Sequence, residues 1–367
     1  MSEITDKKGG HAVQELIKRA VLSLMVFIIL FACFACGGSI ETAGPGEDDR
    51  IMLGFVIEGL VIERWQKDRD IFVSKAKELG AEVIVRNANE DTDRQVEQIY
   101  AIIEEGIDVL LILPYEKDGL TQCIKAAKKK GIKVIAYDRL ILNADIDAYV
   151  AFNSVKVGQL MAGVLYEKVP EGNYIIVNGS QKDNNSYLFN SGFKMALKDG
   201  LDNNRIRIID EVWADDWREN ESYNTVSQAI SEGKRIDAVI GGNDRLAEGA
   251  LKALSEHRLA DDVYVVGHDA ELSACQRIVE GLQLATVYKP IRVLAEGAAE
   301  LAVKMAKGVE IEYEHTIFDG KKEVPFIRYE PVLVTKDNMM DTVIKDGFHT
   351  MEEVYRNVPR DQWPPAE

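Results

Sequence analysis

Polar and charged side chains follow most of the apolar, strand-like runs in this 367-residue sequence. The residues concerned are Glu63-Arg64-Trp65, Asp138-Arg139, Asp183-Asn184-Asn185, Trp213 and Trp217 with Asp215 and Asp216 between them, Asn243-Asp244, His268-Asp269 and Lys289. Carboxylates, amides and guanidinium groups match vicinal hydroxyls, because each hydroxyl both donates and accepts a hydrogen bond. An indole ring packs well on the flat C–H face of a pyranose. These residue types therefore indicate a site for a small sugar.

Several of these residues also have a purely structural interpretation. An Asp or Asn after a strand is often only a helix N-cap, and a cap fits Asn184, Asp216 and Asp244 better than a ligand contact does. Trp65 fits the apolar stripe of a helix as well as it fits a binding site. His268 fits a packed loop residue. We keep these alternatives open at this point.

The hypothesis of an enzymatic function has less support. Two carboxylates across a cleft could hydrolyse a glycoside, but Asp138 and Asp183 are followed directly by Arg139 and Asn184, which favours ionised acceptors over a protonated acid. The sequence contains no G-x-S-x-G, Walker A or G-x-G-x-x-G motif, and its histidines have no metal-ligand spacing. We therefore expect no catalytic residue, no metal and no cofactor.

The elements that would position these residues alternate between short apolar runs and amphipathic helical stretches. The runs fall into two series, 51–57, 83–85, 109–113, 134–137 and 149–152, then 174–177, 206–209, 238–240, 263–266 and 285–288. Continuously apolar strands separated by helices predict parallel sheets buried on both faces. Ten such steps predict two Rossmann-like lobes, with ligands bound between them at the carboxyl ends of the strands.

Charge restricts the ligand. The chain has 61 acidic and 44 basic residues and a net charge of −17. Such a surface repels nucleic acid and anionic headgroups. We expect no nucleic-acid partner, and a neutral or cationic ligand is easier to accommodate than a nucleotide.

The N-terminus predicts export and tethering. Lys18 and Arg19 precede an apolar run, 21–34, that Ser23 alone interrupts, as in a signal segment. Cys36, followed by Gly-Gly-Ser, is the better candidate for a lipid anchor, and Cys33 is the alternative. An uncleaved transmembrane helix is the other possibility. In each case the folded part is extracytoplasmic and membrane-anchored.

The region from 51 to about 350 resembles the D-xylose-binding proteins of sugar ABC transporters, within the type I periplasmic binding protein family. The segments that carry the resemblance are 63–73 (ERWQKDRDIFV), 132–139 (IKVIAYDR), 144–147 (ADID), 183–185 (DNN), 286–291 (TVYKPI) and 341–349 (DTVIKDGFH). Three positions depart from the pattern of the family. Asn153-Ser154 stands where an acid is usual, Glu58 where Asp is frequent, and His268 where Gln is usual, which bears on sugar preference.

The resemblance implies a set of sugar contacts and a mechanism. The implied contacts are Arg64, Asp138, Arg139, Asp183, Asn185, Trp217, Asn243, Asp269 and Lys289. The implied mechanism is closure of the two lobes around a monosaccharide, most simply D-xylose, by a three-segment hinge near 113–114, 152–154 and 288–290. The implied partner is an ABC transporter permease or, alternatively, a membrane histidine kinase.

The expected organisation has four parts. Residues 1–50 form the anchor and tether, 51–152 plus about 290–320 form the N-terminal lobe, and 153–289 plus about 321–348 form the C-terminal lobe. The tail, 349–367, has no hydrophobic periodicity, and we expect it to be loosely held.

Overall fold

The computed structural model describes residues 50–365, so the apolar N-terminal run with Cys33 and Cys36 lies outside the described part. All ten predicted strands are present. They are β1 (Ile51–Ile57), β2 (Ala81–Asn87), β3 (Val109–Leu113), β4 (Lys133–Tyr137), β5 (Ala148–Phe152), β6 (Gly172–Asn178), β7 (Ile206–Trp213), β8 (Ala238–Gly241), β9 (Tyr264–Val266) and β10 (Thr286–Tyr288).

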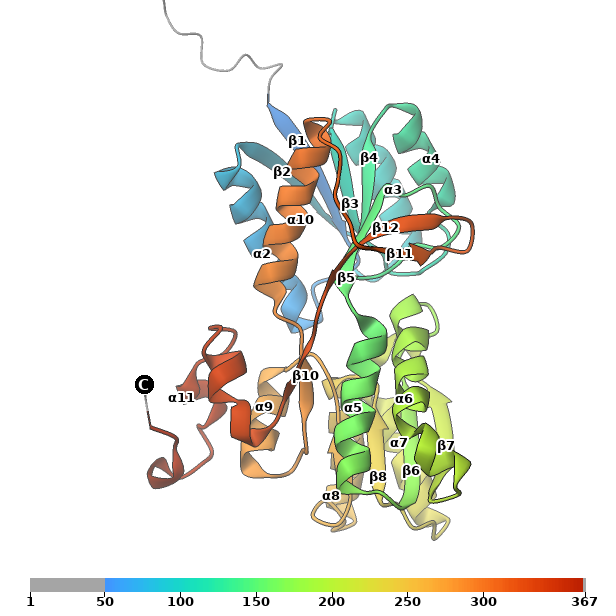
Figure 1. Ribbon diagram of the computed structural model, residues 1–367, viewed down its shortest axis with the longest axis vertical. Coiled ribbons are helices and arrows are strands. Elements are labelled where there is room, and N and C mark those ends of the chain that lie inside the picture. The colour runs from blue at the N-terminus through green and yellow to red at the C-terminus, as the bar shows by residue number, and fades with distance from the viewer. Residues whose placement is uncertain (1–49, 366–367) are drawn as a thin grey trace, which may run out of the picture. The chain divides into compact units, whose positions relative to one another are not determined.

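The strands form two main sheets (Figure 1). The first has the order β2-β1-β3-β4-β5-β12-β11, with β11 (His315–Phe318) and β12 (Glu323–Tyr329) at one edge. Its pairings are parallel except β11 with β12. The second has the order β7-β6-β8-β9 and is parallel throughout. β10 pairs antiparallel with β13 (Val332–Val334) and joins β9 through a single bridge.

Helices cover both faces of each sheet. They are α2 (Glu63–Glu78), α3 (Thr92–Glu104), α4 (Thr121–Lys129), α5 (Ser154–Lys168), α6 (Asn184–Asp202), α7 (Glu219–Ser231), α8 (Asp244–Glu256), α9 (Leu272–Glu280), α10 (Ile291–Ala306) and α11 (Met351–Val354). We call the seven-stranded sheet with α2, α3, α4 and α10 the first lobe, and the four-stranded sheet with β10, β13 and the remaining helices the second lobe.

Burial on both faces explains why the strands are continuously apolar. Phe55 of β1 packs in one core with Phe72 of α2 and Leu294 of α10. Val56, the next residue, points to the opposite face and packs with Ile99 of α3. Successive side chains of a strand alternate between the two faces, so a sheet covered by helices on both sides favours apolar residues at successive positions of its inner strands.

The chain crosses between the lobes three times, from β5 to α5, from β10 to α10, and from β12 to β13 (Figure 1). The last crossing corrects our expectation. We placed 321–348 in the C-terminal lobe and one hinge segment at 113–114. Instead, β12 pairs with β5 in the first sheet, so the chain crosses only after Tyr329. The 113–114 segment joins β3 to α4 within the first lobe, and Lys117 beyond it merely contacts Lys182 of the second lobe.

The tail also differs from expectation. The side chain of Thr350 caps α11 by accepting from the N–H of Glu353. Val354 and Tyr355 are buried in a small core with residues of α9 and β10. These apolar contacts hold the segment against α9, although they form no periodic pattern. Across residues 50–365, no helix is both long and apolar enough to cross a bilayer.

Candidate functional site

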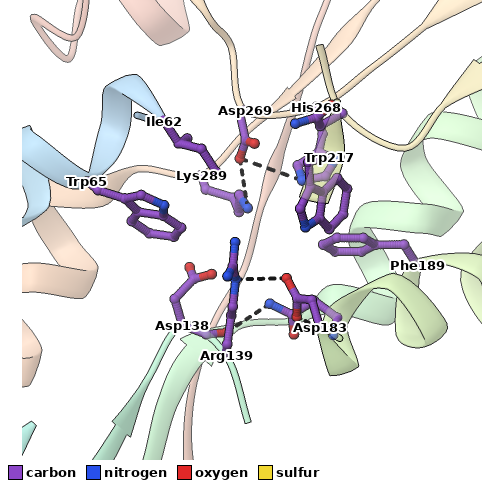
Figure 2. A pocket seen from close by; sticks show the side chains of 12 residues that line it. Ile62, Trp65, Asp138, Arg139, Asp183, Phe189, Trp217, His268, Asp269 and Lys289 are labelled. Carbon is purple, nitrogen blue, oxygen red and sulfur yellow. Dashed lines mark hydrogen bonds and ion pairs between the residues drawn. The ribbon is translucent and has the colours of Figure 1, made fainter. Parts of the chain in front are cut away.

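A small cavity lies between the two lobes, at the carboxyl ends of the strands (Figure 2). Its volume is about 20 Å³, room for roughly one water molecule. Side chains from both lobes fill most of the space around it. The lining residues are Ile62, Trp65, Asp138, Arg139, Asp183, Asn185, Phe189, Trp217, Asn243, His268, Asp269 and Lys289.

The structure brings together all nine residues that the resemblance implied as sugar contacts. Eight of them line the cavity. The ninth, Arg64 in the first turn of α2, pairs with two of the eight: its Nη2 lies 2.9 Å from Oδ2 of Asp138, and its Nη1 lies 3.7 Å from Oδ1 of Asp269. Residues that follow six strands (β4, β6, β7, β8, β9 and β10) thus meet residues from the first turns of α2 and α6 at one place.

Each of the three cations at the site lies beside a carboxylate. Arg64 pairs with Asp138, and Nζ of Lys289 lies 2.8 Å from Oδ1 of Asp269. The guanidinium of Arg139 bridges the lobes, because Nε lies 2.8 Å from Oδ2 of Asp183. The positive charges are therefore largely balanced before any ligand arrives.

Two further buried carboxylates, Glu58 and Asp68, accept hydrogen bonds from the arginines. Glu58 accepts a hydrogen bond of 2.6 Å from Nη1 of Arg139 and one of 2.9 Å from Nε1 of Trp65. Asp68, one turn along α2, accepts from Nε of Arg64 at 3.3 Å. Burial raises the pKa of Glu58 to about 7, although its ion pair with Arg139 opposes this.

Asp269 and Arg64 stay charged because neighbouring groups shift their pKa values. Burial raises the pKa of the Asp269 carboxyl, but His268, Lys289 and Arg64 together bring that pKa far below its usual range. Burial lowers the pKa of Arg64, and the carboxylates of Asp138 and Asp68 more than reverse this. Buried ion pairs add little net stability, and strongly shifted pKa values concentrate at functional sites. The cluster therefore makes this cleft the candidate functional site.

The backbone is strained where it presents these side chains. Asp138, Trp217 and Asp269 have positive φ angles of 58°, 58° and 98°. Such conformations cost non-glycine residues about 1–3 kcal/mol each. Gly179 leaves room for the indole of Trp217, because a Cβ at this position would collide with that ring. Strain at three cavity residues again points to function rather than to stability.

Helix capping and cavity lining coincide at two positions. Asn243 caps α8 by accepting from the N–H of Leu246 at 3.0 Å, and it also lines the cavity. Asp183 caps α6 with Oδ1, which accepts from the N–H of Asn185 at 2.8 Å, while its Oδ2 faces Arg139. The two interpretations of post-strand polar residues are therefore compatible.

Asn185 ties the lobes to each other. Its Nδ2 donates to the carbonyl of Asp138 in the first lobe at 3.0 Å. Its Oδ1 accepts from Oγ of Ser154 at 3.1 Å and from the hydroxyl of Tyr149 at 3.3 Å. Ser154, which stands where the resembling family usually has an acid, is thus a donor to this amide.

Sequence reasoning did not select Ile62, Phe189 and His268 as contacts. The ring centroid of His268 lies 4.6 Å from that of Phe189 and 6.1 Å from that of Trp217. Phe189 is in the second turn of α6, and no strand-end signal marks such a position. Trp65 serves both of its proposed roles, since it packs in the core of the first lobe and lines the cavity.

Two buried donors at the site lack protein partners. Among residues 50–365, no hydrogen-bond acceptor serves Nη1 of Arg64 or Nε1 of Trp217. A buried donor without an acceptor costs about 1–3 kcal/mol, so these atoms suit an oxygen-rich ligand. Nowhere in the same range do three or more His, Cys, Asp or Glu residues cluster in a way that could hold a metal ion.

The chain is similar to known proteins of one family. A model of the periplasmic binding protein domain matches residues 53–310. The chain is 45% identical to the D-xylose-binding periplasmic protein of Escherichia coli K12, over 87% of this chain and 97% of that one. It is 43% identical to the D-xylose-binding periplasmic protein of Haemophilus influenzae, over 92% of this chain and 99% of that one.

Solved structures support the same fold. An ABC transporter solute-binding protein from Clostridium phytofermentans with bound β-D-glucose matches with a TM-score of 0.77 and 28% identity, over 83% of this chain and 99% of that one. A carbohydrate transporter solute-binding protein from Chloroflexus aurantiacus in complex with D-glucose matches with a TM-score of 0.78 and 26% identity, over 83% and 98%. The predicted two-lobed type I α/β fold is confirmed.

Proposed function

This chain belongs to the periplasmic binding protein domain family, and from that membership we propose that it is an extracytoplasmic receptor that binds a monosaccharide, D-xylose in the first instance. The two relatives described above are named for D-xylose. The nine cleft residues are the proposed sugar contacts. The proposal is a binding function without catalysis.

One observation carries the proposal: cations and carboxylates from both lobes alternate around a single cleft and balance each other. Arg64 with Asp138, and Lys289 with Asp269, are two such pairs. An anionic ligand would have to compete with these carboxylates. A neutral polyol needs no net charge, and its hydroxyls can accept from the cations and donate to the carboxylates.

The partnerless donors refine the assignment. Nη1 of Arg64 and Nε1 of Trp217 approach the cleft from different lobes. A sugar that offers oxygens to both would bridge the lobes. The indole of Trp217 and the ring of Phe189 supply apolar faces for the C–H groups of the sugar.

Binding requires the lobes to move. The cavity holds about 20 Å³, which is too little for a pentose. We propose that the lobes separate by rotation at the three crossing segments and close again around the sugar. The sugar would favour the closed form because only that form lets it contact both lobes.

A thermal-shift panel of pentoses and hexoses on the detergent-solubilised full-length protein tests this function. A ligand that binds the folded state raises its melting temperature. D-xylose should give the largest shift, and calorimetry should show one site. If no monosaccharide in the panel shifts the melting temperature, the proposal is wrong. Release of free xylose from xylosides would contradict its non-enzymatic part.

We further propose tethering through Cys36, with Cys33 as the alternative, although both lie outside the described residues. Cys36→Ala should move the protein from the membrane fraction to the soluble fraction, and Cys33→Ala should not.

The proposed partner is an ABC permease that accepts the sugar from the closed form. Reconstitution with the permease encoded beside it should show xylose-stimulated ATP hydrolysis, and a neighbouring kinase gene instead would favour the sensory alternative.

A further inference from the structure

The loop that carries Asp269 has a strained backbone. Asp269 and the next residue, Ala270, both have positive φ angles, 98° and 52°. Neither residue is a glycine, so this conformation persists only because surrounding contacts impose it. The orientation of the Asp269 carboxylate toward Lys289 and Arg64 depends on those contacts.

Hydrogen bonds from three backbone amides hold one side of the loop. Its amides donate to elements of the second lobe: Asp269 to the carbonyl of Val287 at 2.9 Å, Ala270 to Oγ1 of Thr286 at 3.1 Å, and Glu271 to Oδ2 of Asp244 at 3.0 Å. The loop carbonyl of Ala270 lies 2.9 Å from Nε2 of His349. A carbonyl oxygen only accepts, so Nε2 carries the proton and donates.

His349 belongs to the C-terminal segment beyond β13. It is 4% exposed. Its neighbour Phe348 contacts the first lobe, because the carbonyl of Phe348 accepts from Nζ of Lys67 at 2.7 Å, and this ammonium also lies 4.1 Å from the centre of the Phe348 ring. Lys67 lies on α2, three residues after Arg64. Residues 348–349 thus contact, from outside the cleft, both elements whose side chains meet inside it.

We propose that His349 is a positioning residue for the sugar site: its hydrogen bond to Ala270 holds the Asp269 loop in the conformation that aims the carboxylate into the cleft. This inference rests on the proposed function. Without the imidazole, the carbonyl of Ala270 loses a donor and the loop relaxes from its left-handed conformation. The carboxylate of Asp269 then moves away from the place between Lys289 and Arg64.

Three variants of the full-length protein test the role. His349→Ala removes the donor, whereas His349→Gln keeps an N–H that can reach the same carbonyl. Val354→Ala is the matched control, because Val354 is fully buried in the same segment and has no polar group to offer the loop. His349→Ala should weaken D-xylose binding about fivefold, the effect of one hydrogen bond. His349→Gln should recover most of that loss, and Val354→Ala should lower the melting temperature with little change in affinity.

A double-mutant comparison separates positioning from general stability. Combined with Asp269→Asn, the His349→Ala change should cost less than it does alone, because both act on one carboxylate. Combined with Asn243→Ala, its full cost should remain. Unchanged affinity in His349→Ala, or full additivity with Asp269→Asn, would overturn the inference.

Hydrogen exchange without sugar keeps this inference distinct from the proposed function. Amides 269–271 should exchange faster in His349→Ala than in Val354→Ala. If the wild-type protein binds no monosaccharide, the proposed function fails, and this measurement still decides whether His349 holds the loop. Equal exchange in the two variants would refute the inference whether or not sugar binds.

Discussion

Arg64 of the first lobe and Asp269 of the second place Nη1 and Oδ1 3.7 Å apart across the cleft. This separation is longer than a hydrogen bond. Each group has a second partner, Asp138 at 2.9 Å and Lys289 at 2.8 Å. A hydroxyl between the two could accept from the guanidinium and donate to the carboxylate, so we propose that the pair binds one sugar hydroxyl from two sides.

Asp269→Ala should weaken D-xylose binding by about 2 kcal/mol or more, roughly thirtyfold in Kd. The reason is that Lys289 loses its ion-pair partner, Arg64 loses a nearby opposite charge, and the sugar loses an acceptor. Calorimetry on the full-length variant measures the effect. Asp261→Ala, at an exposed position of the same lobe, is the control. Wild-type affinity in Asp269→Ala would remove this residue from the site.

Trp217→Phe should lose most of any xylose-induced change in tryptophan fluorescence. The indole is 6% exposed and lines the cavity, so closure around a sugar changes its surroundings. Affinity should fall about fivefold, because Phe lacks the N–H that we assign to a sugar oxygen. Trp363→Phe, in the C-terminal segment, should keep the signal. A signal of undiminished size in Trp217→Phe would place the responsive indole elsewhere.

A bond at the cleft mouth should control how fast sugar leaves. The hydroxyl of Tyr115, after β3, donates to Oδ1 of Asp216 in the second lobe at 2.7 Å. Burial raises the pKa of Tyr115 to about 12, so the hydroxyl keeps its proton at neutral pH. The bond joins the two lobes, so Tyr115→Phe should destabilise the closed form.

Stopped-flow measurements should show release about threefold to fivefold faster in Tyr115→Phe, with association nearly unchanged, as expected when one interlobe hydrogen bond is lost. Tyr100→Phe, at an exposed tyrosine of α3, provides the control. Equal release rates in the two variants would show that the bond does not hold the cleft shut.

Strand ends could be predicted from the sequence, and with them most of the cleft. The apolar runs before Asp138, Asn243 and Asp269 are local signals, and parallel topology brings their carboxyl ends together. A polar residue directly after such a run can therefore be assigned to the cleft from the sequence alone, before any distance between residues is known. All ten predicted strands exist; the inner strands β3, β5 and β8 are buried on both faces, whereas the edge strands β2 and β7 are only partly buried.

Long-range pairing could not be predicted in this way. β12 contains Pro325 and Arg328 and is only partly buried, so it lacks the continuous apolar signature, and its pairing with β5 involves residues far apart in sequence. Phe189 reaches the cavity from a helix interior, where an apolar residue is expected for packing alone. The role of His349 depends on the strained loop at Ala270, which no sequence pattern reveals.

The buried imidazole of His268 should make the protein less stable as the pH falls. Burial lowers the pKa of His268 to about 4, with Lys289 adding to this and Asp269 opposing it. The unfolded chain has its ordinary value near 6.5, so between about pH 6.5 and 4 the unfolded state binds a proton that the native state excludes. The free energy of unfolding therefore decreases as the pH is lowered from about 6.5 to 4. Glu58, whose raised pKa acts in the opposite direction, is common to wild type and variant.

Melting temperatures of wild type and His268→Gln from pH 7.5 to 4.5 isolate this contribution. The wild-type curve should fall more steeply below pH 6.5, because Gln cannot take up the proton. His257→Gln, at an exposed histidine, is the control and should follow the wild type, since this side chain lies outside the buried cluster around His268. Parallel curves for wild type and His268→Gln would mean that His268 takes up a proton in the folded protein as well. The imidazole beside Phe189 and Trp217 would then not be neutral.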